Sequence, residues 1–185
     1  MTTVKIETPW ERYGTITYIA ENVSICGKTA LQKLVYFLQE WKDVPLGYNY
    51  EFYTYGPFSS ELMGDLDYSD SLGAVQVKAV PTGGYCIVSG NRSKEIKDRS
   101  KEFLLKYKTE IDDVINTFGG SSAVRLELLA TTHYVFAYFS GQNTECDSLL
   151  VTETVHSLKP GKFTTEQIQD AVRFLKDKNV IASCI

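Results

Sequence analysis

The first third of the chain shows a helical spacing of its hydrophobic positions. Residues 8–22 place apolar side chains on one side at intervals of three or four residues, and Pro9 suits a first helical turn. A second helix is predicted from Thr29, because Thr29 and Gln32 have the spacing of a capping box and an apolar stripe follows them. Pro45 lies in the segment that ends this helix.

A strand and a third helix are predicted next. Residues 48–55 alternate between two faces, which is typical of a strand. Gly56 and Pro57 should end this strand, because proline has no amide hydrogen to donate and glycine turns freely. A third helix opens at Ser59 or its predecessor and continues to about residue 71.

A β-hairpin should follow the third helix. Residues 74–80 and 85–89 are β-prone, and a four-residue loop with two glycines separates them. The order helix, helix, strand, helix and hairpin is of the winged-helix type, with the strand one helix later than in the commonest version.

The second half of the chain is predicted to be almost entirely helical. Its elements are a long polar helix over 91–118 ended by Gly119 and Gly120, a helix over 121–139, a helix over 146–158, a helix over 164–178 with a capping box from Thr164 to Gln167, and a short strand at 180–181. The helix over 121–139 is apolar on most sides, so the first half must cover it.

These elements predict the fold class and the domain organisation. We expect a mainly helical α+β fold in a single compact domain. Its winged-helix-like N-terminal lobe spans about residues 1–118, and its helical C-terminal lobe spans about residues 121–185.

Composition and charge narrow the class of protein. Hydrophobic residues make up 43% of the chain and charged residues 23%, which is ordinary for a globular protein. The net charge of −4 argues against a domain whose main work is binding phosphates. The first residues lack the apolar run of a signal peptide, and no stretch reaches the about 18 apolar residues of a membrane span. We therefore expect a cytoplasmic protein that does not enter the membrane.

Neither a metal site nor a catalytic site is predicted. The four cysteines, Cys26, Cys86, Cys146 and Cys184, lie far apart and form no paired motif, so we expect thiols and no bound metal. His133 lies on an apolar helical face, where a hydrogen-bonded core histidine is the commoner case. The sequence contains no catalytic or phosphate-binding motif, so we expect no enzyme activity and no cofactor; an enzyme that uses His133 is the third hypothesis.

Charge is distributed unevenly between two predicted helices. The third helix has four acidic residues, Glu61, Asp65, Asp67 and Asp70, and neither lysine nor arginine. Such a helix would be repelled by phosphates, so it cannot be an ordinary DNA-recognition helix. The next helix is basic over residues 92–108, with Arg92, Lys94, Lys97, Arg99, Lys101, Lys106 and Lys108 against Glu95, Asp98 and Glu102.

Two interpretations of the basic helix stay open. It is either a solvated face with ion pairs such as Lys94–Asp98 and Asp98–Lys101, or one of two charged surfaces of a protein-binding or dimerising module. If the protein binds DNA, the candidate residues are Arg92, Lys94, Lys97 and Lys101.

The most distinctive segments are residues 28–38 and 53–62. The first places Gln32, Lys33 and Tyr36 on the flank of an apolar helix. The second places Tyr55 before a Gly-Pro turn and then opens a helix whose free amides can hold an anion or a carboxylate. The plainer interpretation is a turn that links strand to helix, with Tyr55 packed across it.

These two segments resemble a known family. Their Leu-Gln-Lys-Leu and Tyr-Gly-Pro sequences, together with residues 128–134 and 158–181, are similar to the YwgA-like family of uncharacterised prokaryotic proteins, and the first two also resemble the Panacea (SocA-like) antitoxin domain. The resemblance implies a non-enzymatic domain with toxin–antitoxin, phage-defence or proteolytic-adaptor roles that acts by direct protein contact. The long C-terminal lobe departs from the Panacea pattern.

The sequence thus predicts a protein-binding domain whose partner is another protein, with a homodimer possible. The candidate residues are Gln32, Lys33, Tyr36, Tyr55, Gly56, Pro57, Glu61 and Asp65. The alternative is a winged-helix DNA-binding transcription regulator.

Overall fold

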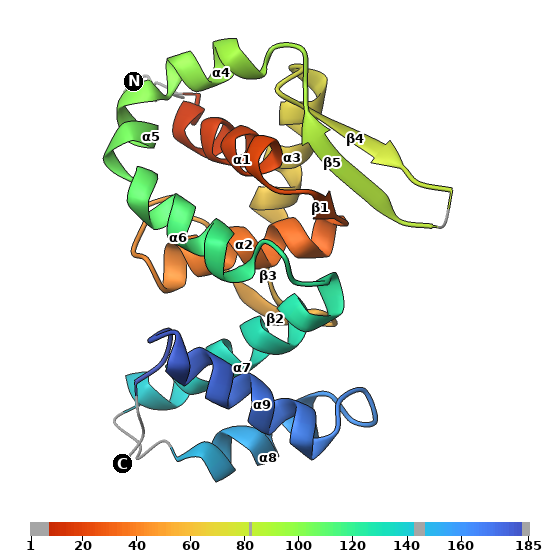
Figure 1. Ribbon diagram of the computed structural model, residues 1–185, viewed down its shortest axis with the longest axis vertical. Coiled ribbons are helices and arrows are strands. Elements are labelled where there is room, and N and C mark those ends of the chain that lie inside the picture. Colours follow the sequence, from red (N-terminus) through yellow and green to blue (C-terminus); the bar gives the residue numbers. More distant parts are fainter. Residues whose placement is uncertain (1–7, 82, 143–146, 183–185) are drawn as a thin grey trace, which may run out of the picture.

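The N-terminal part of the protein combines short helices with two small antiparallel sheets. A computed structural model describes residues 8–81, 83–142 and 147–182 (Figure 1). The first eight elements are α1 (Trp10–Asn22), β1 (Ile25–Cys26), α2 (Lys28–Glu40), β2 (Glu51–Tyr53), β3 (Gly56–Phe58), α3 (Ser60–Ser71), β4 (Val75–Ala79) and β5 (Tyr85–Ser89). The predicted third helix and hairpin are confirmed; residue 82 of the hairpin loop lies outside the described residues.

The remaining elements are helices. They are α4 (Ser93–Arg99), α5 (Lys101–Lys106), α6 (Lys108–Phe118), α7 (Ala123–Gly141), α8 (Ser148–Leu158) and α9 (Thr165–Asp177). A mainly helical α+β fold is therefore confirmed. The division into two lobes stays a prediction, and the names N-terminal lobe (α1–α6) and C-terminal lobe (α7–α9) are used for these groups of helices. None of the described helices is long and apolar enough to cross a membrane.

Three strands form the larger sheet, in the order β1-β5-β4 with antiparallel pairing. Ile25 of β1 pairs with Ile87 of β5, and both side chains are buried. No strand is predicted from the sequence at β1, because two residues are too few to show alternation.

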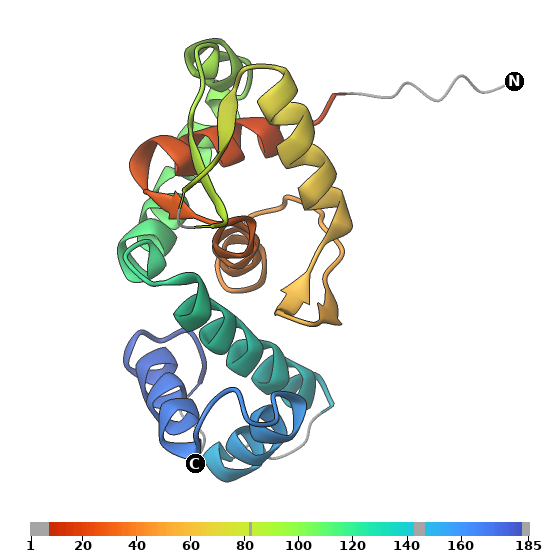
Figure 2. The ribbon, with the colours of Figure 1, turned by 90° about the vertical axis from the view of Figure 1, so that its right-hand side faces the viewer.

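One apolar core runs through both lobes. Phe37 of α2 stacks on Phe118 of α6 with ring centroids 4.0 Å apart, and Phe118 lies 6.1 Å from Phe174 of α9. α7 lies beneath α2 and the β2–β3 hairpin (Figure 2) and is buried along much of its length, as its apolar sequence predicts.

Helix starts that depend on local chemistry are confirmed. Ser59, Ser122 and Thr164 cap α3, α7 and α9, each accepting a hydrogen bond from an amide three residues ahead. Thr164 and Gln167 complete the predicted capping box. α8 is capped by Asp147, and the predicted start at residue 146 lies outside the described residues.

The capping box predicted at Thr29 is wrong. α2 begins after Gly27, which has a φ of 100° and caps the helix without a side chain. The side chain of Gln32 is buried and bonds to Ser59 instead, 27 residues further along the chain. A tertiary partner therefore replaces the local one.

The predicted strand over 48–55 is also corrected. Only Glu51–Tyr53 is a strand, and Gly56–Phe58 forms its partner strand instead of merely ending it. Pro57 is compatible with this position because the pair is narrow and has free edges. The expected alternation holds, since Tyr48 is buried and Asn49 exposed.

The long helix predicted over 91–118 is three helices. The chain bends at Ser100 and Tyr107, whose φ angles are −110° and −107°. The bends wrap the chain around α1, where Gly14 leaves room for Ser100: a Cβ on Gly14 would lie 1.8 Å from the Ser100 hydroxyl oxygen. A purely local periodicity cannot reveal such a bend.

The short strand predicted at 180–181 is wrong. Val180 and Ile181 are buried, but their amides donate to the carbonyl of Leu175 and so finish the turn after α9. Their apolar character reflects packing against the core.

Candidate functional site at the Gly-Pro hairpin

The β2–β3 hairpin presents two tyrosines to solvent. We call residues 51–58 the Gly-Pro hairpin. Tyr53 is 64% exposed and Tyr55 is 54% exposed. The Tyr53 ring lies 5.7 Å from that of Phe58, and the Lys162 ammonium lies 4.9 Å from the centre of the Tyr55 ring. The hairpin therefore offers aromatic surface held by neighbouring side chains.

α2 anchors the inner side of the hairpin. Lys33, only 1% exposed, donates a 2.5 Å hydrogen bond from Nζ to the Pro57 carbonyl. Gln32 bonds both backbone groups of Ser59: its amide donates to the carbonyl at 2.7 Å, and its oxygen accepts from the amide at 3.0 Å. Buried polar groups must find such partners, so these bonds fix the path of β3.

The C-terminal lobe anchors the turn of the hairpin. Lys159 donates from Nζ to the Thr54 carbonyl at 2.5 Å and to the Glu127 carboxylate at 3.0 Å. Lys162 contacts both oxygens of Glu127 at 2.8 Å. Glu127 is 2% exposed and belongs to α7. One buried carboxylate thus orients both lysines beside the turn.

Burial also changes the acidity of Lys33, the buried lysine that holds the hairpin. Burial lowers the pKa of Lys33 to about 7; Glu127 opposes this change and Lys159 adds to it. Lys33 therefore loses its proton more readily than an exposed lysine does.

Gly56 lets the hairpin approach α7 closely. Its φ of 81° lies in the left-handed region, and a Cβ there would lie 2.6 Å from the Thr131 hydroxyl oxygen. The Thr131 hydroxyl is itself buried without a hydrogen-bond partner in the described part of the chain. A side chain at position 56 would therefore require the hairpin or the Thr131 side chain to move.

His133 is a core residue in the structure, as predicted. It is buried and shares a 2.8 Å hydrogen bond between Nδ1 and the Tyr36 hydroxyl. Burial lowers the pKa of His133 to about 4. The ring is thus neutral at physiological pH and serves the packing of α2 on α7.

The eight predicted protein-binding residues fall into different environments. Five of them are buried: Gln32, Lys33, Tyr36, Gly56 and Pro57. Tyr55 and Glu61 are exposed. Asp65 is partly buried, accepts from the Tyr48 hydroxyl at 2.9 Å and faces Arg12 at 3.6 Å. Because these five are buried, none of them belongs to the surface that the hairpin presents to solvent.

Sequence reasoning missed Tyr53, Glu127, Lys159 and Lys162 as parts of this site. Glu127 carried a usable signal, because a carboxylate within a helix that is apolar on most sides requires a buried cation. Its partners, 32 and 35 residues away, could not be identified from periodicity.

The acidic residues of α3 partly serve the fold. Glu61 accepts from the Asn49 amide at 3.2 Å, and Asp70 from the Val77 amide at 3.0 Å. Asp67 faces Lys28 at 3.1 Å.

The basic residues of α4–α6 form ion pairs other than those predicted. Arg92 and Arg99 both contact Glu95, Lys97 pairs with Glu21, and Lys108 pairs with Asp112. Lys94 and Lys101 form no salt bridge with another described residue. Of the four candidate DNA-binding residues, Lys94 and Lys101 therefore carry a positive charge that no described carboxylate pairs with.

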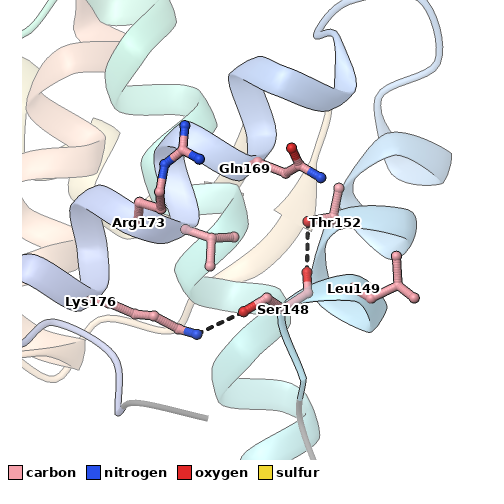
Figure 3. A pocket seen from close by; sticks show the side chains of 7 residues that line it. Ser148, Leu149, Thr152, Gln169, Arg173 and Lys176 are labelled. Carbon is pink, nitrogen blue, oxygen red and sulfur yellow. Dashed lines mark hydrogen bonds between the residues drawn. The ribbon is translucent and has the colours of Figure 1, made fainter. Parts of the chain in front are cut away.

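A further pocket of about 420 Å³ lies between α8 and α9 (Figure 3). Its two cations are already engaged: Lys176 donates to the Ser148 hydroxyl at 2.7 Å, and Arg173 pairs with Asp170. This arrangement does not single out a ligand class.

The described residues contain no group of three metal-ligating side chains. Cys26 and Cys86 are free thiols, and residues 146 and 184 lie outside the described part.

Fold and site together define a mainly helical α+β protein whose Gly-Pro hairpin is anchored by buried charges. No family model matches the chain. It is 25% identical over 162 residues to "Uncharacterized protein YwgA" of Bacillus subtilis (strain 168), an alignment that covers 85% of this chain and 90% of the relative. This similarity supports the YwgA-like resemblance. The relation to the Panacea domain stays a prediction.

Proposed function

We propose that the protein is a non-enzymatic protein-binding domain that presents Tyr53 and Tyr55 of the Gly-Pro hairpin to another protein. The proposal rests on the exposure of both rings above a backbone that is held from two sides. Tyrosine is frequent among residues that dominate binding energy, and a prearranged loop loses little conformational entropy on binding.

The anchoring of the hairpin also gives a role to buried residues of the two segments that resemble the family. Lys33 and Gln32 set the backbone geometry of the hairpin, and Gly56 allows its contact with α7. The resemblance to Panacea-type antitoxins favours an antitoxin-like, adaptor or regulatory role, including phage defence.

The second candidate is a DNA-binding regulator with a winged-helix N-terminal lobe. The order α1, β1, α2, α3, β4, β5 and the sheet order β1-β5-β4 suit that layout, with the Gly-Pro hairpin inserted before α3. The free charges of Lys94 and Lys101 favour this candidate. The acidic character of α3, the helix in the recognition position, opposes it.

Site-specific photocrosslinking in the native host tests the first candidate. A photoreactive phenylalanine analogue is placed at position 53 or 55 and, as a matched control, at Tyr68 or Tyr85, which are 49% and 48% exposed elsewhere. We expect one protein to crosslink at the hairpin positions and not at the controls; a second copy of this chain would identify a homodimer. Equal crosslinking at all four positions would refute the proposal.

DNA-shift assays at two salt concentrations test the second candidate. Salt-sensitive binding at physiological ionic strength that is weakened by Lys94→Ala and Lys101→Ala would establish it in place of the first. A stoichiometric protein complex that survives nuclease treatment would exclude it as the primary function.

A further inference from the structure

A second pocket, of about 360 Å³, lies away from the exposed tip of the Gly-Pro hairpin, between α2, residues 48–50 and α7. We call it the tyrosine pocket. Five of its lining residues are tyrosines and one is acidic: Tyr36, Tyr48, Tyr50, Tyr134, Tyr138 and Glu40. The elements that carry them lie next to one another in Figure 2.

Regular spacing brings these side chains together. Tyr36 and Glu40 are one helical turn apart on α2, and Tyr134 and Tyr138 are one turn apart on α7. Tyr48 and Tyr50 alternate onto the same face of their extended segment. The pocket is therefore built by three elements.

Neighbouring tyrosine rings of the pocket contact one another edge to face. The Tyr36 and Tyr50 rings are 5.1 Å apart at 83°, and those of Tyr48 and Tyr50 are 6.5 Å apart at 72°. These edge-to-face contacts fix the positions of the rings that line the pocket, and aromatic ring faces attract cations. The same cluster already holds one cation, because the Arg12 guanidinium lies 4.3 Å from the centre of the Tyr48 ring.

Two polar groups complete the pocket. The Tyr50 hydroxyl is buried and has no hydrogen-bond partner among the described residues, so it can accept a bond from a ligand. Glu40 is exposed, and among the described residues of the lining it alone carries a full charge. The Arg12 charge behind Tyr48 is offset by Asp65 at 3.6 Å.

We infer that the tyrosine pocket binds an organic cation, an alkylammonium or guanidinium group. Ring faces and the Glu40 carboxylate attract its charge, and an N–H group can donate to Tyr50. Anionic ligands are disfavoured, because Glu40 would repel them and none of the described residues that line the pocket is a lysine or an arginine. The cation can come from a lysine or arginine side chain or from a free small molecule.

Titration with matched probes tests the inference. Choline is compared with 3,3-dimethylbutan-1-ol, which has the same shape without the charge, and N-acetyl-arginine amide and N-acetyl-lysine amide represent side chains. Binding is followed by NMR on the full chain with labelled tyrosines. We expect saturable changes at the pocket tyrosines, with the neutral analogue bound at least about threefold more weakly than choline. Tighter binding of the amino-acid amides would identify a side-chain source, and tighter binding of choline a free cation.

Variants separate this pocket from the hairpin and from folding. Glu40→Gln and Tyr138→Ala change exposed groups and should each weaken cation binding about threefold. Tyr50→Phe should weaken guanidinium binding without lowering the melting temperature. Tyr85→Ala and Tyr55→Ala should leave the affinity unchanged, so failure of the hairpin proposal would not affect this one. Equal affinities for choline and its neutral analogue, or unaltered binding in a Glu40→Gln, Tyr138→Ala double variant, would overturn the inference.

Discussion

His133 allows a quantitative test of the packing between α2 and α7. Its ring is bonded to Tyr36 in the core, where burial lowers the pKa from 6.5 to about 4. Unfolding returns the imidazole to water and to its ordinary pKa of about 6.5. Between these two pKa values, the unfolded chain holds a proton that the folded chain does not. The free energy of unfolding must therefore fall as the pH is lowered from 7 toward 4.

The size of the effect follows from the difference between the two pKa values. The full difference corresponds to about 3 kcal/mol, and about 2 kcal/mol of it is lost between pH 7 and pH 5. A change of this size is large against the about 5–15 kcal/mol that stabilises a typical domain.

Urea unfolding of the wild type and of His133→Gln, at pH 7 and at pH 5, measures the effect. Both proteins contain the same carboxylates, so their contribution cancels when the two pH-dependent losses are compared. The wild type should lose about 2 kcal/mol more than the variant. An NMR titration of His156→Gln, in which His133 is the one remaining histidine, should give a midpoint near pH 4. Equal losses in both proteins, or a midpoint near 6.5, would refute the buried neutral imidazole.

Three further predictions concern the Gly-Pro hairpin. Glu127→Gln should lower the free energy of unfolding by about 3–5 kcal/mol in urea titrations, because it leaves Lys159 buried without its counter-charge; a loss under 1 kcal/mol would contradict this. Gly56→Ala should lower the free energy of unfolding by at least about 1–2 kcal/mol because of its left-handed backbone alone. Adding Thr131→Ala should remove the clash with the Thr131 hydroxyl but leave this backbone cost, and thermal melts of the single and double variants measure both. Tyr55→Ala should change the unfolding free energy by less than about 0.5 kcal/mol while abolishing the hairpin crosslink from position 53, whereas global unfolding would show that the ring serves packing alone.

Local sequence signals were sufficient to predict helix starts that depend only on residues nearby in the chain. Ser59, Ser122 and Thr164 cap their helices because each needs only an amide three residues ahead. The same logic failed at Thr29, since a distant backbone segment outcompeted the local partner for the side chain of Gln32.

The site was less predictable because its contacts are long-range. The bend at Ser100 exists because Gly14, far earlier in the chain, leaves space for it. Similarly, the pairing of Glu127 with Lys159 and Lys162 depends on how α7 meets the loop before α9. The sequence pattern correctly indicated which segments form the candidate site. It could not show which side chains are buried and anchor the hairpin and which are exposed to solvent.

That distinction changes what the predicted relation to the Panacea domain would imply. Its two segments meet in space, because Lys33 from the Leu-Gln-Lys-Leu helix donates to the carbonyl of Pro57 in the Tyr-Gly-Pro turn. Both ends of this bond are buried, so proteins that share the two segments would share this way of holding the hairpin. Under the proposed function, partner choice would instead depend on exposed side chains such as Tyr53 and Tyr55. On this proposal, proteins with the same anchor would differ in their partners through these exposed residues, and the crosslinking experiment at positions 53 and 55 addresses that part of the molecule.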